Sequence, residues 1–278
     1  MSTETVTSSD GTTIAFTSVG AGPAIVLVHG AMQAAANFSS LARELSSSFR
    51  VHAIDRRGRG SSGPHRADHS LDTEVADLKA VLAKTGARFV FGLSSGALVA
   101  LAAAESGAEI ERLAVYEPPF TIDGADPAKW GSRYEAEIAR GATARAMVTA
   151  LIATGDRDFL SHVPRVVFVP FAFVLLRLDA RRAREGHTSI RDLVPTVRYD
   201  IRVQREASAR LAAIESIRCP LLLLGGDRSH DAIRASLDAF AARMPHARRV
   251  ELRGVGHIAA DDVGRPKDVA RELLRFFG

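Results

Sequence analysis

The stretch Phe91-Gly92-Leu93-Ser94-Ser95-Gly96 carries the strongest evidence for the fold of this protein. An apolar run (89–91) precedes it and an Ala/Leu-rich run (97–106) follows it, which predicts a strand, a tight turn and a helix. Glycine is needed on both sides of Ser94, because a β-carbon there would collide with neighbouring backbone in so sharp a turn. The turn would lift the Ser94 hydroxyl above the carboxyl edge of a sheet, over the free N–H groups of the next helix.

The composition is that of an ordinary globular protein. The chain has 278 residues, of which 46% are hydrophobic and 24% charged, enough for one large α/β domain or a domain with a sizeable insertion. Its single cysteine, Cys219, excludes internal disulfides and a multi-cysteine metal site. The net charge is +4, and the arginines are interspersed with acidic residues, so we expect them on a solvated surface. No basic patch with interleaved aromatic residues is visible, which argues against a nucleic-acid partner.

Two segments bear on targeting and on membrane binding. The first ten residues are polar and lack the apolar core of a signal peptide. The most apolar run, 166–176, is too short to span a bilayer and contains Pro170, so we expect a buried or lid helix there. The sequence therefore predicts a cytoplasmic protein without a membrane partner.

Strand-like and helix-like segments alternate in the first and last parts of the chain, which predicts a parallel sheet with right-handed crossovers. The segment 120–216 breaks this alternation and is expected to consist of successive helices. We therefore predict an α/β core formed by 1–119 and 217–278, with 120–216 as a helical insertion. The expected strands include 24–28, 51–54, 89–91, 113–116, 221–224 and 249–252, and the expected helices of the insertion are 127–140, 143–154, 164–177 and 200–214.

A glycine-rich segment, 55–63, ends in the pattern Gly-x-Gly-x-x-Gly of dinucleotide-binding sites. Three charged residues separate the preceding strand from the glycines, and Pro64 interrupts the chain where a helix would have to begin, so we interpret it as a loop. His65 and His69 have the i, i+4 spacing of a metal-binding pair. They fall in the same loop, and we expect both to be solvated.

Gly254-Val255-Gly256-His257 follows the last predicted strand, in a flexible loop that would let an imidazole reach over the sheet edge. Ser94, an acid after a later strand and His257 thus follow one another, each at the carboxyl end of a strand. That edge is where an open α/β sheet places its functional site.

At this point the sequence resembles the α/β-hydrolase family, in its lid-bearing, esterase/lactonase-like branch. The resemblance is carried by His29-Gly30, the segment 55–62, Gly92 to Gly96, and Gly256-His257, and it is weakest in 120–216. It implies a mostly parallel eight-stranded sheet flanked by helices, with 120–216 as the family's variable helical lid.

The resemblance also implies roles for individual residues. Ser94 would be the nucleophile and His257 its general base, because a serine hydroxyl is a poor nucleophile until an imidazole takes its proton. The backbone N–H groups of Ala31 and Ser95 would form the oxyanion hole. Family members that use an aspartate nucleophile, such as haloalkane dehalogenases and epoxide hydrolases, are disfavoured because the position holds serine.

The sequence offers two candidates for the triad acid. Asp227 follows the strand 221–224, where many family members keep the aspartate, but it lies one residue earlier than the family pattern counted from Gly225. Glu117 ends the strand 113–116, and some branches, including certain lactonases and dehalogenases, carry a glutamate there. A buried glutamate without a partner would be costly, so we prefer Glu117 and keep Asp227 as the alternative.

These residues predict a serine hydrolase that cleaves a carboxylic ester or lactone of a largely apolar small molecule through an acyl-enzyme, with no metal or organic cofactor. Hydrolysis of a C–C bond and cofactor-free perhydrolysis use the same triad and stay open, as does a ligand receptor without catalysis. We expect substrate contacts from one residue beside the oxyanion hole and three in the apolar run of the insertion: Met32, Phe168, Phe171 and Phe173.

Overall fold

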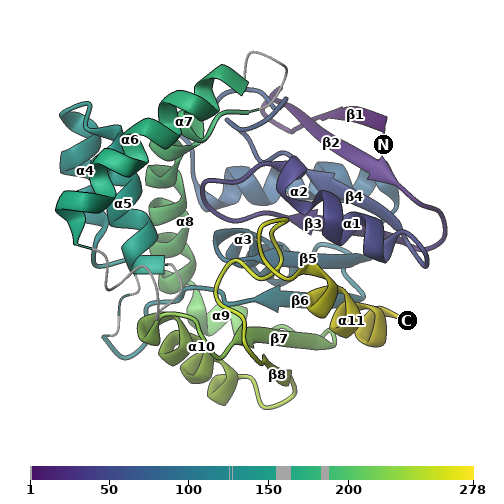
Figure 1. The fold of residues 1–278 in the computed structure, drawn as a ribbon. Helices are drawn as coiled ribbons and strands as arrows, with labels where there is room; N and C mark the ends of the chain where they lie inside the picture. Colours follow the sequence, from purple (N-terminus) through teal and green to yellow (C-terminus); the bar gives the residue numbers. More distant parts are fainter. Residues whose placement is uncertain (1, 125, 127, 155–163, 183–187) are drawn as a thin grey trace.

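An eight-stranded sheet runs through the computed structural model, which describes residues 2–124, 126, 128–154, 164–182 and 188–278 (Figure 1). The strand order is β1-β2-β4-β3-β5-β6-β7-β8. β2 pairs antiparallel with β1 and β4, and the strands from β4 to β8 pair in parallel, as predicted. The strands are β1 (Ser2–Thr7), β2 (Thr13–Val19), β3 (Ala24–Val28), β4 (Arg50–Ile54), β5 (Phe89–Leu93), β6 (Arg112–Tyr116), β7 (Leu221–Gly226) and β8 (Arg248–Leu252).

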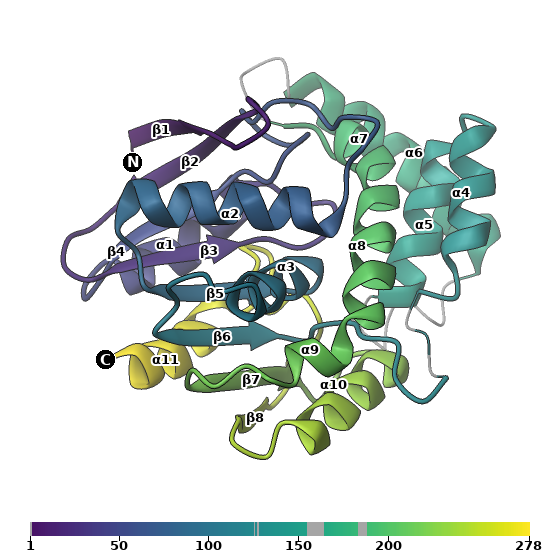
Figure 2. The same cartoon turned by 180° about the vertical axis from the view of Figure 1, so that it is seen from behind.

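Helices cover both faces of this sheet (Figures 1 and 2). The short 3₁₀ helix Ala35–Phe38, α1 (Ser39–Leu45) and α11 (Pro266–Phe277) pack on one face. On the other face lie α2 (Leu71–Thr85), α3 (Ser95–Glu105) and α10 (Asp231–Arg243). The central strands are therefore buried on both sides, which explains why they read as continuous apolar runs in the sequence.

The segment 120–216 enters the chain between β6 and β7, and we call it the helical block. It lies at the carboxyl ends of the parallel strands, with α8 next to the sheet and α4, α5 and α6 farther out (Figures 1 and 2). Its described helices are α4 (Gly131–Ala139), α5 (Thr143–Thr154), α6 (Arg165–Arg182), α7 (Ile190–Leu193), the 3₁₀ helix Val194–Thr196, α8 (Val197–Ala209) and α9 (Leu211–Ile214).

The helix expected over 143–154 is present with these bounds as α5, whereas the other helices of the block differ from their predicted ranges. α6 continues through Pro170, although proline removes a hydrogen bond inside a helix. Phe168, Ala172 and Leu176 compensate for that loss, because they lie on one side of α6 and are buried in the apolar core of the block. The helix expected over 200–214 is split into α8 and α9 at Arg210.

Three arginines that we expected on the surface are buried, so that expectation was wrong for them. Arg56, Arg57 and Arg59 are each at most 2% exposed. Each guanidinium meets a carboxylate of α2 or α8, and a buried charge is tolerated when it is paired in this way. The sequence does not reveal these partners, because they belong to other elements that lie 18, 20 and 141 positions further along the chain. The pairs are Arg56 with Glu74, Arg57 with Asp77 and Arg59 with Asp200, at N···O distances of 2.6, 2.7 and 2.6 Å.

The glycine-rich segment 55–63 forms a loop, as predicted. Asp55 accepts hydrogen bonds from the backbone N–H groups of Ala35 and Ser61, so the segment folds around its own acid. The expectation that the two loop histidines are solvated was wrong. His69 is fully buried, and the His65 ring stacks on Tyr199 of α8 with 3.6 Å between ring centroids.

Candidate active site

The turn after β5 has the strained geometry that its glycines predict. Ser94 has φ 54° and ψ −122°, a conformation that is rare for a residue with a side chain. A β-carbon on Gly92 would lie 2.6 Å from the backbone of α3, and one on Gly96 would lie 2.3 Å from a carbonyl oxygen just after β3. The turn therefore excludes any larger residue at either position, and α3 begins directly after Ser94.

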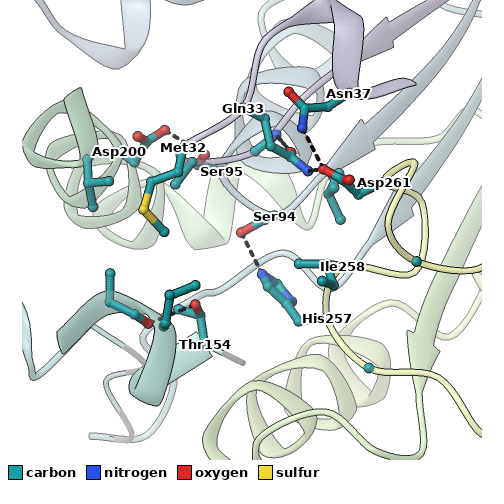
Figure 3. Close-up of a pocket in the computed structure, with 18 of the residues that line it drawn as sticks. Met32, Gln33, Asn37, Ser94, Ser95, Thr154, Asp200, His257, Ile258 and Asp261 are labelled. Atoms are coloured by element: carbon teal, nitrogen blue, oxygen red, sulfur yellow. Dashed lines mark hydrogen bonds between the residues drawn. The ribbon is translucent and has the colours of Figure 1, made fainter. Parts of the chain in front are cut away.

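Ser94, His257 and Glu117 form a connected chain of side chains (Figure 3 shows the first two). The Ser94 Oγ lies 3.0 Å from His257 Nε2, and His257 Nδ1 lies 2.6 Å from Glu117 Oε2. Glu117 is fully buried, and its φ of 48° turns the chain sharply at the end of β6. With Nδ1–H donating to the carboxylate, Nε2 is free to accept the hydroxyl proton of Ser94.

The second oxygen of Glu117 is also held. Oε1 accepts a 2.7 Å hydrogen bond from the backbone N–H of Gly226 and another of 2.7 Å from the hydroxyl of Ser229. A β-carbon on Gly225 would lie 3.1 Å from the same oxygen, so the end of β7 fits closely around the acid. The carboxylate thus has three hydrogen-bond partners, which fix its orientation towards His257.

Asp227 lies elsewhere. Its Oδ1 accepts a 2.7 Å hydrogen bond from the backbone N–H of Gly254, in the loop that leads to His257. Of the two acids that the sequence proposed, the structure brings Glu117 to His257 and uses Asp227 to fasten the loop. The position expected for the acid, after the strand 221–224, is not the one beside the imidazole, because Glu117 at the end of β6 occupies that space.

Ala31 and Ser95, the two residues expected in an oxyanion hole, both line the cavity beside Ser94. Ser95 is the first residue of α3, and the N–H of a residue at that position has no acceptor within the helix. Met32 lines the same cavity and has a positive φ of 54°, so the chain turns sharply just after Ala31.

His29 braces the segment that enters this turn. Its Nδ1 lies 2.8 Å from the carbonyl oxygen of Gly30, and its Nε2 accepts from the backbone N–H of Arg56 at 3.2 Å. Burial lowers the pKa of His29 to about 3, with a further contribution from the neighbouring arginines. The imidazole is therefore neutral at pH 7, in the tautomer that carries its proton on Nδ1.

A side-chain clamp that the sequence analysis missed joins the segment 30–37, which follows β3, to the loop that carries His257 (Figure 3). The Oδ2 of Asp261 accepts from Gln33 Nε2 at 2.6 Å and from Asn37 Nδ2 at 2.9 Å. Gln33 in turn accepts from the backbone N–H of Gly30 at 2.8 Å. Burial raises the pKa of Asp261, which lies four residues after His257. That proximity to His257 is the signal that could have pointed to it.

A second contact missed from the sequence ties Ser95 to the helical block. The Ser95 hydroxyl donates to Asp200 Oδ1 at 2.7 Å and accepts from Arg56 Nη1 at 2.9 Å. Asp200 belongs to α8, is 5% exposed and also binds Arg59. The pKa of Asp200 is lowered: burial alone would raise it, and the two arginines more than offset that effect.

The cavity above Ser94 has a volume of about 810 Å³ and lies between the sheet edge and the helical block. Such a volume suits a small molecule. Most of the residues that the block contributes are apolar, and its polar ones are Thr154, Asp179, Thr188, Asp200 and Gln204. Apolar lining residues from the block include Trp130, Met147, Leu151, Leu193, Val197 and Ile201.

The three phenylalanines predicted to contact substrate do not line this cavity. Phe168 is buried among the helices of the block, where it packs in their common apolar core. Phe171 and Phe173 are 59% and 49% exposed on the outer side of α6. The apolar run misled the prediction because α6 turns only one of its sides inward, and the part of the cavity wall that the helical block contributes comes mainly from α5, α7 and α8.

Within the part of the chain that the structure describes, no group of three or more His, Cys, Asp or Glu side chains is placed to hold a metal ion. None of the helices described is long and apolar enough to cross a membrane.

The site combines a strained serine after a central parallel strand, a histidine in the loop after the last strand and an acid at the same edge of the sheet. This combination points to a class of α/β protein. The model of the alpha/beta hydrolase family matches residues 25–272, and the chain belongs to this family. The predicted family and fold are thereby confirmed.

Individual relatives are similar over almost the whole chain. A pimeloyl-[acyl-carrier protein] methyl ester esterase from Xanthomonas campestris is 28% identical and aligns over 93% of this chain and 96% of its own. The crystal structure of an alpha/beta hydrolase from Sphaerobacter thermophilus is 34% identical, with a TM-score of 0.78 over 99% of this chain and 100% of its own. An enol-lactonase from Burkholderia xenovorans shares the fold, at 20% identity and a TM-score of 0.70 over 99% of each chain.

Proposed function

We propose that the protein is a serine hydrolase that cleaves a carboxylic ester or lactone of a largely apolar small molecule through an acyl-enzyme. The observation that carries this proposal is the chain of contacts from Ser94 through His257 to Glu117 at the base of an apolar cavity. Hydrolysis of an ester is the activity in the name of the Xanthomonas relative, which spans nearly the same length. Cleavage of a lactone is in the name of the enol-lactonase that shares the fold.

In the first half of the reaction, Ser94 Oγ attacks the carbonyl carbon of the ester while His257 Nε2 takes the hydroxyl proton. The pair of electrons displaced from the carbonyl forms an oxyanion, and the tetrahedral intermediate collapses as the bond to the alkoxy group breaks. His257 returns its proton to the departing alcohol, or to the ring-opened hydroxyl of a lactone. The acyl group remains on Ser94.

In the second half, a water molecule attacks the acyl carbon and gives its proton to the same imidazole. Collapse of this second intermediate releases the carboxylic acid and returns the proton to Ser94. Glu117 takes up no proton in either half: Gly226 and Ser229 orient its carboxylate, and the carboxylate holds the imidazole in the tautomer that both halves need. No metal or organic cofactor is required by these steps.

The N–H groups of Ala31 and Ser95 would stabilise the oxyanion in both halves. Each such donor is worth about 3 kcal/mol of barrier in enzymes where one has been removed. Ser95 donates from the N-terminus of α3, so the helix dipole adds to the effect. The strained turn at Ser94 supports this role of Ser95, because it ends directly at the first N–H group of α3.

The helical block would act as the lid over the substrate, with Met32 and the apolar residues of α5, α7 and α8 in contact with it. An apolar cavity of this kind favours a substrate with a hydrocarbon body and a single reactive carbonyl group. The partner of the protein is then a small molecule, and the cytoplasm is the location expected from its sequence.

The experiment that tests the proposal is turnover of p-nitrophenyl acetate and butyrate, with the purified full chain. The wild type should turn over many equivalents with burst kinetics, and Ser94→Ala should lower kcat by at least about a thousandfold without loss of folding. A serine-directed organophosphate should add one covalent mass at Ser94. Release of no more than one equivalent of p-nitrophenol, or an adduct only at another residue, would reject the mechanism.

A further inference from the structure

We propose that Gln33 and Asp261 are positioning residues of this enzyme: the hydrogen bond between their side chains holds the segment of Ala31 against the loop of His257. This role rests on the proposed function, in which the Ala31 N–H and the His257 imidazole act on one carbonyl group. Figure 3 shows the two side chains meeting near Ser94, and both line the cavity. Neither residue takes part in the proton transfers of that reaction.

The bond between Gln33 and Asp261 is buried and can form in one orientation only. The two residues are 6% and 4% exposed, and Gln33 Nε2 lies 2.6 Å from Asp261 Oδ2. Gln33 Oε1 accepts from the backbone N–H of Gly30, which can only donate, so the amide nitrogen must face the carboxylate. Exchange of the two amide atoms would set a donor against the Gly30 N–H and an acceptor against the carboxylate.

At one end, this bond helps to fix the peptide groups on both sides of Gly30. Gln33 holds the N–H of Gly30, and the His29 ring holds its carbonyl oxygen, which belongs to the same peptide group as the Ala31 N–H. The N–H and C=O of a trans peptide point in opposite directions, so these contacts set the direction of the Ala31 N–H. A β-carbon on Gly30 would lie 3.1 Å from that of Ser94, so the segment lies directly against the turn of the proposed nucleophile.

At the other end, the bond reaches His257 through two hydrogen-bonded turns. The N–H of Ala259 donates to the carbonyl oxygen of Gly256 at 3.2 Å, and the N–H of Asp261 donates to that of Ile258 at 3.0 Å. The first turn contains His257, and the second ends at Asp261. A displacement of Asp261 is therefore passed on to the backbone of His257.

Neutral donors hold the carboxylate of Asp261. Besides Gln33, Asn37 Nδ2 donates to Oδ2 at 2.9 Å and the N–H of Val263 donates to Oδ1 at 3.0 Å. Burial raises the pKa of Asp261, and these three donors act against that shift. An amide at this position would turn one of the two oxygens into a donor, which would face an N–H group of Gln33, Asn37 or Val263. The site therefore requires a carboxylate.

Loss of this bond should reduce catalysis rather than binding. Misplacement of a catalytic group by about 1 Å costs up to about a hundredfold in rate. The oxyanion forms only after the attack on the carbonyl carbon, so a displaced Ala31 N–H lowers kcat and leaves KM almost unchanged. A bond that served the fold alone would change the free energy of unfolding and leave the kcat of the folded protein as it is.

Turnover of p-nitrophenyl butyrate by the full chain, with urea unfolding of the same samples, tests the positioning role. Asp261→Asn should lower kcat at least about tenfold and change KM less than about threefold. Asp262→Asn is the matched control, because the Asp262 carboxylate also joins the two segments, through the Ser40 N–H, but does not line the cavity. Its kcat should stay within about threefold of the wild type. Gln33→Met, which removes both hydrogen bonds of the amide, gives the same test if Asp261→Asn does not fold.

The double variant Gln33→Glu/Asp261→Asn exchanges the acid and the amide. Gln33→Glu alone places two carboxylates against each other and should lower kcat at least about tenfold. In the double variant the carboxylate at 33 accepts from the Gly30 N–H and from the amide at 261. Its kcat should therefore exceed that of either single variant at least about threefold.

A trifluoromethyl ketone, which adds to a serine hydroxyl and forms a tetrahedral oxyanion, gives a second measurement. Its inhibition constant should rise for Asp261→Asn by the factor by which kcat/KM falls. Wild-type kcat in Asp261→Asn, an equal loss in Asp262→Asn, a double variant no better than the single ones, or an unchanged inhibition constant would overturn the positioning role. If Ser94→Ala, measured in parallel, is inactive in such a case, only the positioning role is wrong. If Ser94→Ala stays active, the proposed function is wrong as well.

Discussion

The hydroxyl of Ser95 donates a 2.7 Å hydrogen bond to Asp200, and this bond joins the residue after the proposed nucleophile to α8 of the helical block. Arg56 binds both partners, at 2.9 Å from each. Asp200 and the Ser95 side chain therefore act as positioning groups for the Ser95 N–H, if that N–H stabilises the oxyanion. Because Asp200 also lines the cavity, α8 and the proposed oxyanion hole share the same buried charge.

Loss of the Ser95 hydroxyl should lower kcat and leave the free energy of unfolding almost unchanged. Ser95→Ala keeps the backbone N–H but removes the bonds to Asp200 and Arg56, so we expect kcat to fall about tenfold with a small change in KM. Ser18→Ala is the matched control, a buried serine of β2 that hydrogen-bonds to Glu4 and His52 and does not line the cavity. Equal kcat for both variants would show that the Ser95 side chain has no positioning role.

Asp200→Ala should mainly affect folding. It leaves the buried guanidinium groups of Arg56 and Arg59 without a shared carboxylate, and breaking a buried pair costs about 3–5 kcal/mol. Chemical denaturation measures this loss directly, and the midpoint should fall well below that of Ser95→Ala. A stability near that of the wild type would mean that water replaces the carboxylate.

The two acids should respond differently to neutralisation. Glu117→Gln keeps the size of the side chain but removes the charge that orients His257, so kcat should fall by about a thousandfold or more. Asp227→Asn retains an acceptor for the Gly254 N–H and should cost less than about tenfold. Both rates are measured with p-nitrophenyl butyrate on folded protein. The opposite order would transfer the role to Asp227 and leave Ser94 and His257 as proposed.

His65 should make the protein less stable in mild acid. Burial lowers its pKa to about 3 in the folded protein, whereas in the unfolded chain it is near 6.5. The unfolded state therefore binds the proton first as the pH falls, and stability is lost from about pH 6.5 down towards pH 3. At pH 5 the loss from His65 should be about 1 kcal/mol, with allowance for its partial exposure.

The variant His65→Phe isolates this effect, because it preserves a ring that can stack on Tyr199 but has no proton to bind. Its free energy of unfolding should fall less between pH 7 and pH 5 than that of the wild type. His246→Phe, which makes the same replacement at an exposed position, is the matched control. Identical slopes for the wild type and His65→Phe would rule out His65 as the source.

The walls of the cavity should set the preferred length of the acyl group. Leu151→Trp fills part of the space that α5 borders, so activity on butyrate and longer p-nitrophenyl esters should fall at least tenfold relative to acetate. Phe173→Ala should leave the ratio unchanged, since Phe173 lies outside the cavity. A shift of the ratio by Phe173→Ala alone would restore the interpretation drawn from the sequence.

The sequence by itself determined the fold and the two ends of the proposed catalytic chain. The turn around Ser94 is local: glycines at 92 and 96 are required by contacts within a few residues or with one neighbouring strand. The alternation of apolar strands with helices is also local in origin, because burial on both faces forces continuous apolar runs. These patterns can be recognised without knowing which residues far along the chain they contact.

Only the tertiary structure decided which acid meets His257, which arginines are buried and which residues line the cavity. Glu117 and His257 are 140 positions apart, and Arg56 and Asp200 are 144 apart. In the sequence, an arginine that is paired in the interior cannot be told from one on the surface. An apolar helix likewise does not reveal which of its sides is buried. Those outcomes depend on where the helical block comes to lie over the sheet, and no local pattern encodes that position.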